Sequence, residues 1–392
     1  MDSNIEEKHA FLLHFTRFFV TLPSDMAILH VFNPEHDIAL ASNLANFTAP
    51  HAGRQLRSDL AFLPALWAKE GDAVLVDNVE SARKAWGRVH ARVQSLLGRK
   101  ASFMDSAVSL HGKRCFLTWK TMFSNMENDE VNPWGWDRAL KGELTRKGLD
   151  VSLLPSDARL EQIRQLSHRR TAARLLPQLQ SENTVGEAFE CTQAEEVEVL
   201  LSKYGQVVMK APWSSSGRGL RFLSQERTPF QMQAAWFRHL VERQGSVMVE
   251  PFYNKVKDFG MEFYADGKGH IRYEGLSLFH TANGAYVGNI MATECKKREM
   301  ISRYIPVSWL DDAQEKILSC SDLGDYEGPL GVDMMIVKAN DRCLLHPCVE
   351  INLRRTMGHV ALAISPTDDD IQGVMRVIYD GNHYKLKINK LR

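Results

Sequence analysis

The sequence predicts a protein of mixed α/β and α+β class, in which a Rossmann-like N-terminal domain precedes a region of helices and antiparallel strands. Three observations carry this prediction. The chain of 392 residues is too long for one ordinary domain. Up to about residue 154, short apolar runs alternate with helical stretches, a pattern typical of a parallel sheet. Between residues 259 and 294, Asp266-Gly267 and Asn283-Gly284 separate strand-like runs, and both dipeptides favour hairpin turns.

The composition is that of a globular protein with no general affinity for polyanions. It is 44% hydrophobic and 24% charged, and 48 basic side chains balance 48 acidic ones. We therefore expect no nucleic-acid partner and no membrane association, and any anion site must be built locally. The six cysteines form no CxxC pair, which favours reduced thiols and a cytoplasmic location.

Residues 1–25 are expected to form an N-terminal arm. The apolar stretch Phe11–Val20 is interrupted by His14 and Arg17 and is too short to span a bilayer. Met26 stands directly before a strand-like run, so an appended arm or an upstream start codon explains this segment.

Four short apolar runs are predicted as the strands of the first sheet: Ala27–Phe32, Ala73–Val76, Cys115–Thr118 and Val151–Leu154. Ligands of such sheets bind at the carboxyl ends of the strands. The loop after the first run carries Glu35 and His36, which are candidate substrate contacts, whereas Asp37 is explained as a helix cap. Trp134 and Trp136 precede another helix and could shape a pocket, but core packing explains them better. A further helix is expected over residues 156–176.

The first feature with chemical meaning is a strand that ends on a lysine. Val207–Lys210 is followed by a loop of small residues, whose amides and hydroxyls suit phosphate oxygens: Ser214, Ser215, Ser216, Gly217 and Gly219. The loop lacks the Walker GxxxxGK[ST] spacing. An ordinary surface turn with an extended lysine is the alternative.

The second feature is an apolar strand that ends on a carboxylate. Val247–Glu250 could flank a base with its backbone, and Asp258, eight residues further on, could reach ribose hydroxyls. The alternative is a strand end with solvated acids.

The third and fourth features place acids within strands. Asp333 lies in an apolar run, where an unpaired carboxylate is costly and needs a cation or hydrogen-bond donors. Glu350, Asn352 and Arg354 alternate along the next strand and so share one face. Hard oxygen ligands suit Mg²⁺, and a guanidinium binds phosphate or carboxylate. The alternative is the solvated side of an edge strand.

Taken together, these four features resemble the ATP-grasp superfamily over about residues 160 to 375. The resemblance implies a pre-ATP-grasp domain at 26–158, a small lobe at 159–245 and a large lobe at 246–392. It implies that Lys210 and the Ser214–Gly219 loop hold the phosphates, while Glu250 lies at the adenine hinge and Asp258 at the ribose. Asp333, Glu350 and Asn352 would bind magnesium, and Arg354 would hold the phosphorylated intermediate.

One position departs from the family pattern. Where a lysine is common at the start of the first lobe, this chain has Arg169 and Arg170; we assign Arg169 to the phosphates and leave Arg170 open. Asn289 and Arg355 are added as substrate candidates, with His359 as a further one.

The resemblance implies a ligase that uses ATP and Mg²⁺, or Mn²⁺, to convert a carboxylate to an acyl phosphate and join it to an amine or a thiol. Lys210 and Arg354 are its expected catalytic side chains. Its partners would be small carboxylates and amines, and a homodimer is compatible with the sequence. The alternatives are a small-molecule kinase on the same scaffold and a non-catalytic ATP-binding module. The sequence does not name the acid or the amine.

Overall fold

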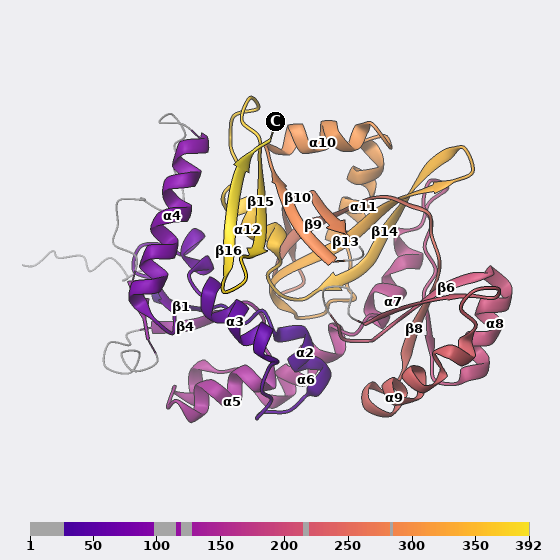
Figure 1. Cartoon of the computed structure of the whole chain (residues 1–392), viewed down its shortest axis with the longest axis horizontal. Helices are drawn as coiled ribbons and strands as arrows, with labels where there is room; N and C mark the ends of the chain where they lie inside the picture. Colours follow the sequence, from indigo (N-terminus) through magenta and orange to yellow (C-terminus); the bar gives the residue numbers. More distant parts are fainter. Residues whose placement is uncertain (1–26, 98–114, 119–127, 215–218, 283–284, 392) are drawn as a thin grey trace, which may run out of the picture.

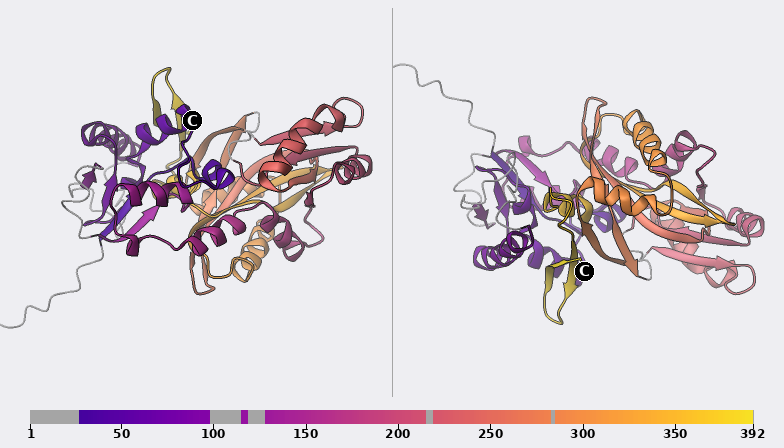
Figure 2. Two further views of the ribbon diagram at one scale, coloured as in Figure 1. Left: turned by 90° about the horizontal axis from the view of Figure 1, so that it is seen from below. Right: turned by 90° about the horizontal axis from the view of Figure 1, so that it is seen from above.

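The computed structural model describes residues 27–97, 115–118, 128–214, 219–282 and 285–391. Within these ranges it is built from four four-stranded sheets, with strand orders β3-β2-β1-β4, β5-β8-β6-β7, β10-β9-β13-β14 and β11-β12-β15-β16. Figure 1 shows β1 and β4 at one end of the molecule and β6, β8, α8 and α9 at the other, and Figure 2 shows the same separation from below and above. No described helix is both long and apolar enough to cross a membrane.

The first sheet is wholly parallel, as the sequence predicts. Its strands are β1 (Ala27–Val31), β2 (Ala73–Leu75), β3 (Cys115–Leu117) and β4 (Asn128–Pro133). The accompanying helices are α2 (His36–Ser42), α3 (His51–Leu60), α4 (Val79–Leu97) and α5 (Arg138–Arg146), with a short 3₁₀ helix at Leu63–Leu66. The strand predicted at Val151–Leu154 is wrong. Val151–Leu153 forms a 3₁₀ turn begun by Asp150, whose side chain accepts from the Ser152 amide, and Val151 is exposed rather than buried.

The second sheet is antiparallel and has a core of its own. It contains β5 (Phe189–Cys191), β6 (Gln206–Lys210), β7 (Leu220–Ser224) and β8 (Val247–Pro251), packed against α8 (Ala194–Tyr204) and α9 (Ala234–Gln244), with a 3₁₀ helix at Phe230–Met232. The fully buried run of β8 explains why its sequence is apolar on both faces.

The third sheet is also antiparallel and lies beside the largest core. Its strands are β9 (Lys255–Asp266), β10 (Ile271–Ser277), β13 (Glu327–Ala339) and β14 (Arg342–Asn352). Along β9, Phe259, Met261 and Phe263 enter the core, so Asp258 and Glu262 face the opposite side. The core side is covered by α7 (Arg170–Leu179), α10 (Glu294–Ser302) and α11 (Ser308–Leu318). The helix predicted over 156–176 is two helices, α6 (Asp157–Leu166) and α7, separated at residues 167–169.

The fourth sheet consists of β11 (Phe279–Ala282), β12 (Ala285–Met291), β15 (Gly373–Tyr379) and β16 (Tyr384–Lys390). The turn predicted at Asn283-Gly284 lies outside the described residues. Together with α12 (Met357–Ala363), this sheet shares a core with the N-terminal helices, so that Leu386 and Ile388 pack in the same cluster as Phe62 and Val89. Residues from the two ends of the described chain therefore complete one hydrophobic core.

Candidate active site

A buried ion pair joins β6 and β8, two neighbouring strands of the second sheet. Nζ of Lys210, at the end of β6, lies 2.5 Å from Oε2 of Glu250 on β8. Both side chains are less than 10% exposed, so this charge-assisted bond is well shielded from water. The lysine and the carboxylate predicted for the phosphates and the adenine hinge thus lie side by side, and Glu250 neutralises Lys210.

The predicted phosphate loop starts and ends at one point. The Ala211 amide donates to the Gly219 carbonyl at 2.8 Å, and a Cβ added to Gly219 would lie 2.5 Å from Oγ of Ser214. The close contact explains the glycine, because any side chain there would displace Ser214. The other predicted loop residues Ser215, Ser216 and Gly217 lie outside the described residues.

The two adjacent arginines at the start of α7 bind different partners. Arg169 donates from Nε to the Ala211 carbonyl at 3.0 Å, and its NH2 lies 2.9 Å from Oε1 of Glu350. Arg170 instead lies 3.1 Å from Glu190. Arg169 therefore connects the segment after Lys210, at the end of β6 in the second sheet, with β14 of the third sheet. Arg170 does not make this connection.

The acids predicted for magnesium face each other across two strands. Asp333 on β13 pairs in register with Glu350 on β14, and Gly331 pairs with Asn352. Nδ2 of Asn352 donates to Asp333 at 3.1 Å. Burial, together with the neighbouring Glu350 carboxylate, raises the pKa of Asp333 to about 7.

This donor set fits magnesium better than a metal that needs a full protein cage. The described residues contain no group of three or more His, Cys, Asp or Glu side chains placed to hold a metal. Asp333 and Glu350 supply two carboxylates and Asn352 an amide, and Mg²⁺ commonly takes its remaining ligands from water and nucleotide phosphates. A partly buried Asp333 with a raised pKa is a group that a divalent cation would stabilise in its ionised form.

Arg354 is held by a residue from the N-terminal domain. Its Nε donates to both carboxylate oxygens of Asp37, at 2.9 and 3.2 Å, and its NH2 donates to Asp37 at 2.8 Å and to Asn352 at 2.9 Å. Burial alone would raise the pKa of Asp37, but Arg354 brings it below the usual value. Asp37 lies in the first turn of α2, as predicted, but α2 has no side-chain cap, and the carboxylate of Asp37 binds the arginine instead.

Asp258 lies on the site face of β9, beside different partners. It accepts from Nζ of Lys255 and from Oγ1 of Thr281, both at 2.6 Å. The ribose contact predicted for it stays a prediction. Nearby, His280 approaches Lys257 at 3.5 Å.

The predicted substrate residues do not form one cluster. Glu35 accepts from Arg57 at 2.8 Å, and burial raises its pKa. Arg355 lies over the ring of Trp67, 4.6 Å from its centre, and burial lowers its pKa to about 10. Asn289 on β12 donates to Ser277 on β10 at 3.0 Å and accepts from Tyr286, and neither partner is a predicted nucleotide or metal ligand.

His359 forms the capping box of α12 together with Thr356 and does not contact Asp333 or Glu350. Its Nδ1 accepts from the Thr356 amide at 3.1 Å and lies 3.0 Å from Glu262. The buried Glu262 also accepts from Oγ1 of Thr356 at 2.8 Å. These contacts anchor the segment that follows Arg354 to β9.

A small pocket lies between the start of α2 and residues that the sequence predicts to bind the nucleotide and the metal. The side chains that share it come from α2, the phosphate loop and β14: His36, Asp37, Ser214, Glu350 and Asn352. The sequence did not single out Asp37 as a site residue. Its position at the start of the helix that follows β1 was the available signal, because ligands of such sheets bind at the carboxyl ends of the strands.

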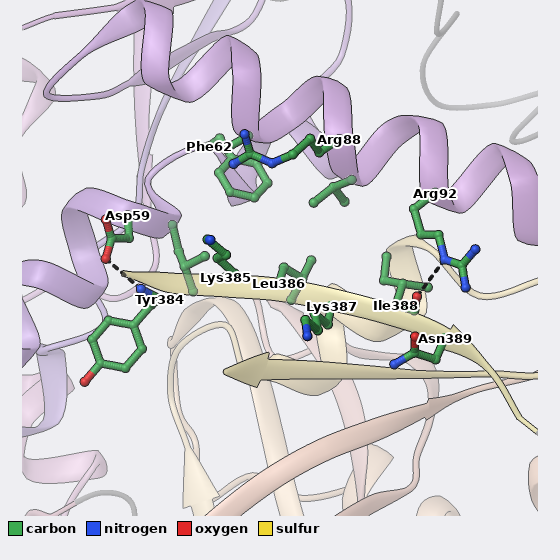
Figure 3. A pocket seen from close by; sticks show the side chains of 13 residues that line it. Asp59, Phe62, Arg88, Arg92, Tyr384, Lys385, Leu386, Lys387, Ile388 and Asn389 are labelled. Carbon is green, nitrogen blue, oxygen red and sulfur yellow. Dashed lines mark hydrogen bonds between the residues drawn. The ribbon is translucent and has the colours of Figure 1, made fainter. Parts of the chain in front are cut away.

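A larger cavity, of about 360 Å³, lies elsewhere, between α4 and β16 (Figure 3). Leu386, Ile388 and Phe62 form its apolar wall, and Arg92 donates from Nε to the Ile388 carbonyl at 2.9 Å. None of the residues discussed above as nucleotide or metal ligands lines it. Several of the polar side chains that the sequence predicts for the site line the smaller pocket instead.

No protein-family model matches the sequence, and no curated protein matches it. Solved structures do match. The N5-carboxyaminoimidazole synthetase from Staphylococcus aureus complexed with ADP is 12% identical over 91% of this chain and 83% of that chain, with a TM-score of 0.47. The biotin carboxylase–beta-gamma-ATP complex from Campylobacter jejuni is 12% identical over 90% of this chain and 75% of that chain, with a TM-score of 0.47. A protein from Archaeoglobus fulgidus assigned to the ATP-grasp superfamily is 13% identical over 93% of this chain and 100% of that chain, with a TM-score of 0.44. The solved structures that resemble this chain thus include ATP-grasp proteins, the superfamily that the motifs resemble.

Proposed function

We propose that this chain is an ATP- and Mg²⁺-dependent ligase that activates a carboxylate as an acyl phosphate and joins it to an amine. The observation that carries the proposal is the position of Arg169, which contacts both the Ala211 carbonyl next to Lys210 and the Glu350 carboxylate. A phosphate chain placed there would meet Lys210 at one end and the paired acids at the other. A cytoplasmic location, where ATP and Mg²⁺ are abundant, fits this function.

Each side chain has a defined task in this proposal. Lys210 and Arg169 neutralise phosphate oxygens, while Asp333, Glu350 and Asn352 would hold Mg²⁺, which neutralises charge on the transferring phosphoryl group. Arg354, with its guanidinium fixed by Asp37, lies beside Asn352 and orients the carboxylate and then its acyl phosphate. Little covalent help is needed for phosphoryl transfer, so positioning and charge neutralisation account for catalysis.

The test is to incubate the purified chain with Mg-ATP and a pool of amino acids and small carboxylates, and to measure ADP, AMP and phosphate. ADP and phosphate that appear only when an acid and an amine are both present would support the ligase. ADP with a stable phosphorylated product would favour the kinase instead. ATP binding without substrate-dependent turnover would contradict both enzymes and favour a binding module.

A further inference from the structure

Two loops at the carboxyl ends of neighbouring strands lock together beside the candidate active site. β1 and β4 are parallel neighbours, and Figure 1 shows them side by side. Nδ2 of Asn33, just after β1, donates to the Gly135 carbonyl at 2.8 Å and to Oδ2 of Asp137 at 3.2 Å. The Gly135 amide donates back to Oδ1 of Asn33 at 3.3 Å. The loop after β4 is thereby fixed against the segment that joins β1 to α2, the helix that begins at His36.

This contact fixes the orientation of one imidazole. Nδ1 of His36 lies 3.0 Å from Oδ2 of Asp137, and the two side chains are only 1% and 2% exposed. The other oxygen of Asp137 accepts from the Leu140 amide at 2.8 Å, so the carboxylate cannot turn away. Gly135 leaves no room beside the ring, because a Cβ there would lie 2.7 Å from Cδ2 of His36.

The tautomer follows from this geometry. A carboxylate facing Nδ1 requires that this nitrogen carries the proton, so the lone pair of the neutral ring is on Nε2. Nε2 is buried and has no hydrogen-bond partner among the described residues. Leaving a buried polar atom unpaired is unfavourable, and a bound group that hydrogen-bonds to Nε2 would remove that cost.

The position of His36 separates it from the other buried histidine–aspartate pair of this domain. Nε2 of His30 lies 3.0 Å from Asp72, and its Nδ1 also lacks a partner among the described residues. His30 does not line the small pocket, whereas His36 lines it together with Glu350 and Asn352. Of these two histidine–aspartate pairs, only that of His36 combines an unpaired ring nitrogen with a place in the small pocket.

We propose that His36 is the general base that accepts a proton from the amine nucleophile, and that Asp137 is the positioning residue that fixes its tautomer. This inference rests on the ligase function proposed above and adds a proton acceptor to it. It also specifies the nucleophile as a nitrogen that carries a removable proton, such as a primary amine.

The proton and electrons balance in one sequence. The amine nitrogen attacks the acyl carbon and forms the C–N bond, and the nitrogen becomes positively charged. One N–H proton passes to Nε2 of His36, the C–O bond to phosphate breaks, and phosphate leaves with that electron pair. The imidazolium then gives the proton to the departing phosphate, which returns His36 to its starting state.

Hydroxylamine separates this step from the earlier one. It is largely unprotonated at neutral pH and captures acyl phosphates without a base, so hydroxamate formation reports carboxylate activation alone. Wild type, His36→Gln, Asp137→Asn and the control His30→Gln are incubated with Mg-ATP and a pool of amino acids and small dicarboxylates, with and without hydroxylamine. The hydroxamate and the amide products are both measured.

We expect His36→Gln to lower amide formation by roughly 10²–10⁴-fold, as for loss of a general base, while hydroxamate formation changes less than about threefold. Asp137→Asn should lower amide formation by about tenfold, because the ring loses its fixed tautomer. His30→Gln should change neither product.

Equal loss of both products in His36→Gln, or unchanged amide formation, would overturn the role of His36. Wild type that yields no hydroxamate and no ADP would overturn the ligase function itself, and the inference with it. A second measurement does not depend on the variants: ¹⁵N NMR of labelled histidine in the wild-type protein should show His36 protonated on Nδ1. A proton on Nε2 instead would contradict the assignment, because that nitrogen could not then accept one.

Discussion

The carboxylate of Asp37 accepts hydrogen bonds from two guanidinium nitrogens of Arg354, although the two residues are 317 positions apart in the chain. Asp37 lies in the first turn of α2, and Arg354 lies two residues after the end of β14. The orientation of Arg354, which also binds Asn352, therefore depends on a residue of α2.

Replacing Asp37 with Asn should lower ATP-dependent turnover by about 10–100-fold, because the arginine loses the charge that aims it. Removing one partner of a buried pair also costs roughly 3–5 kcal/mol of folding stability when the other charge is left without compensation. Arg354 keeps its bond to Asn352, so we expect the lower part of that range. Substrate-dependent ADP release and urea denaturation measure the two effects.

The control is Asp341→Asn in the exposed turn between β13 and β14, which should change neither quantity. Equal turnover in Asp37→Asn and Asp341→Asn would contradict a positioning role for Asp37.

Replacing Glu350 with Gln should abolish Mg²⁺-dependent turnover, because the site loses one of its two carboxylates. The same change removes the partner of Arg169, so ATP affinity in the absence of Mg²⁺ should be measured alongside. Calorimetric titration with Mg²⁺ in the presence of ADP gives the metal affinity directly. Glu327→Gln, at an exposed position of β13, is the matched control. Full activity of Glu350→Gln would remove the metal assignment.

Without a metal, the free energy of unfolding should fall as the pH rises from about 4 to about 7. Burial raises the pKa of Asp333 to about 7 in the folded protein, whereas an unfolded Asp titrates near pH 3.9. Between these values the folded protein holds a proton that the unfolded chain has lost, so increasing pH destabilises the fold. Each pKa unit corresponds to about 1.4 kcal/mol, which limits the effect to a few kcal/mol.

Urea denaturation in EDTA at about pH 5 and about pH 7.5 measures this dependence. Asp333→Asn should flatten it, since the amide does not titrate. An identical pH dependence in wild type and Asp333→Asn would show that another group is responsible.

Replacing Gly219 with Ala should weaken ATP binding by about tenfold or more, because the new methyl group would meet Oγ and Cβ of Ser214 at 2.5 and 2.6 Å. The base of the phosphate loop would have to open to admit it. Fluorescence titration with a labelled ATP analogue measures the affinity. Gly87→Ala in α4, where nothing lies within 4 Å, should leave binding unchanged and stabilise the helix by up to about 1 kcal/mol. Equal affinities in the two variants would contradict a tightly closed loop base.

Local patterns in the sequence were sufficient for much of the scaffold. The apolar runs at Val207–Lys210 and Val247–Glu250 become β6 and β8, because continuous burial demands such sequences. Alternation along residues 350–352 places Glu350 and Asn352 on one face of β14, which the register with Asp333 and Gly331 reflects. By contrast, Val151–Leu154 has strand composition but no partner strand, and its exposed valine lies in a 3₁₀ turn.

The side-chain partners in the site depend on contacts that no local pattern contains. Nothing near Asp37 in the sequence indicates Arg354 as its partner. Arg169 and Arg170 are adjacent and identical, and only the three-dimensional arrangement separates them, since one faces Glu350 and the other Glu190. Asp137 precedes a helix in the sequence and caps it in the structure through one carboxylate oxygen. Its second oxygen binds His36 of α2, a contact that the local sequence does not indicate.

The shared core of the N-terminal helices and the last hairpin sets an order for folding during synthesis. Leu60, Phe62 and Val89 leave the ribosome long before Met375 and Ile388, which pack in the same cluster. The apolar faces of α3 and α4 therefore stay uncovered while most of the chain is being made, and they are available to chaperones in that interval. A nascent chain that stalls before Gly373 would keep this surface exposed and be prone to aggregation.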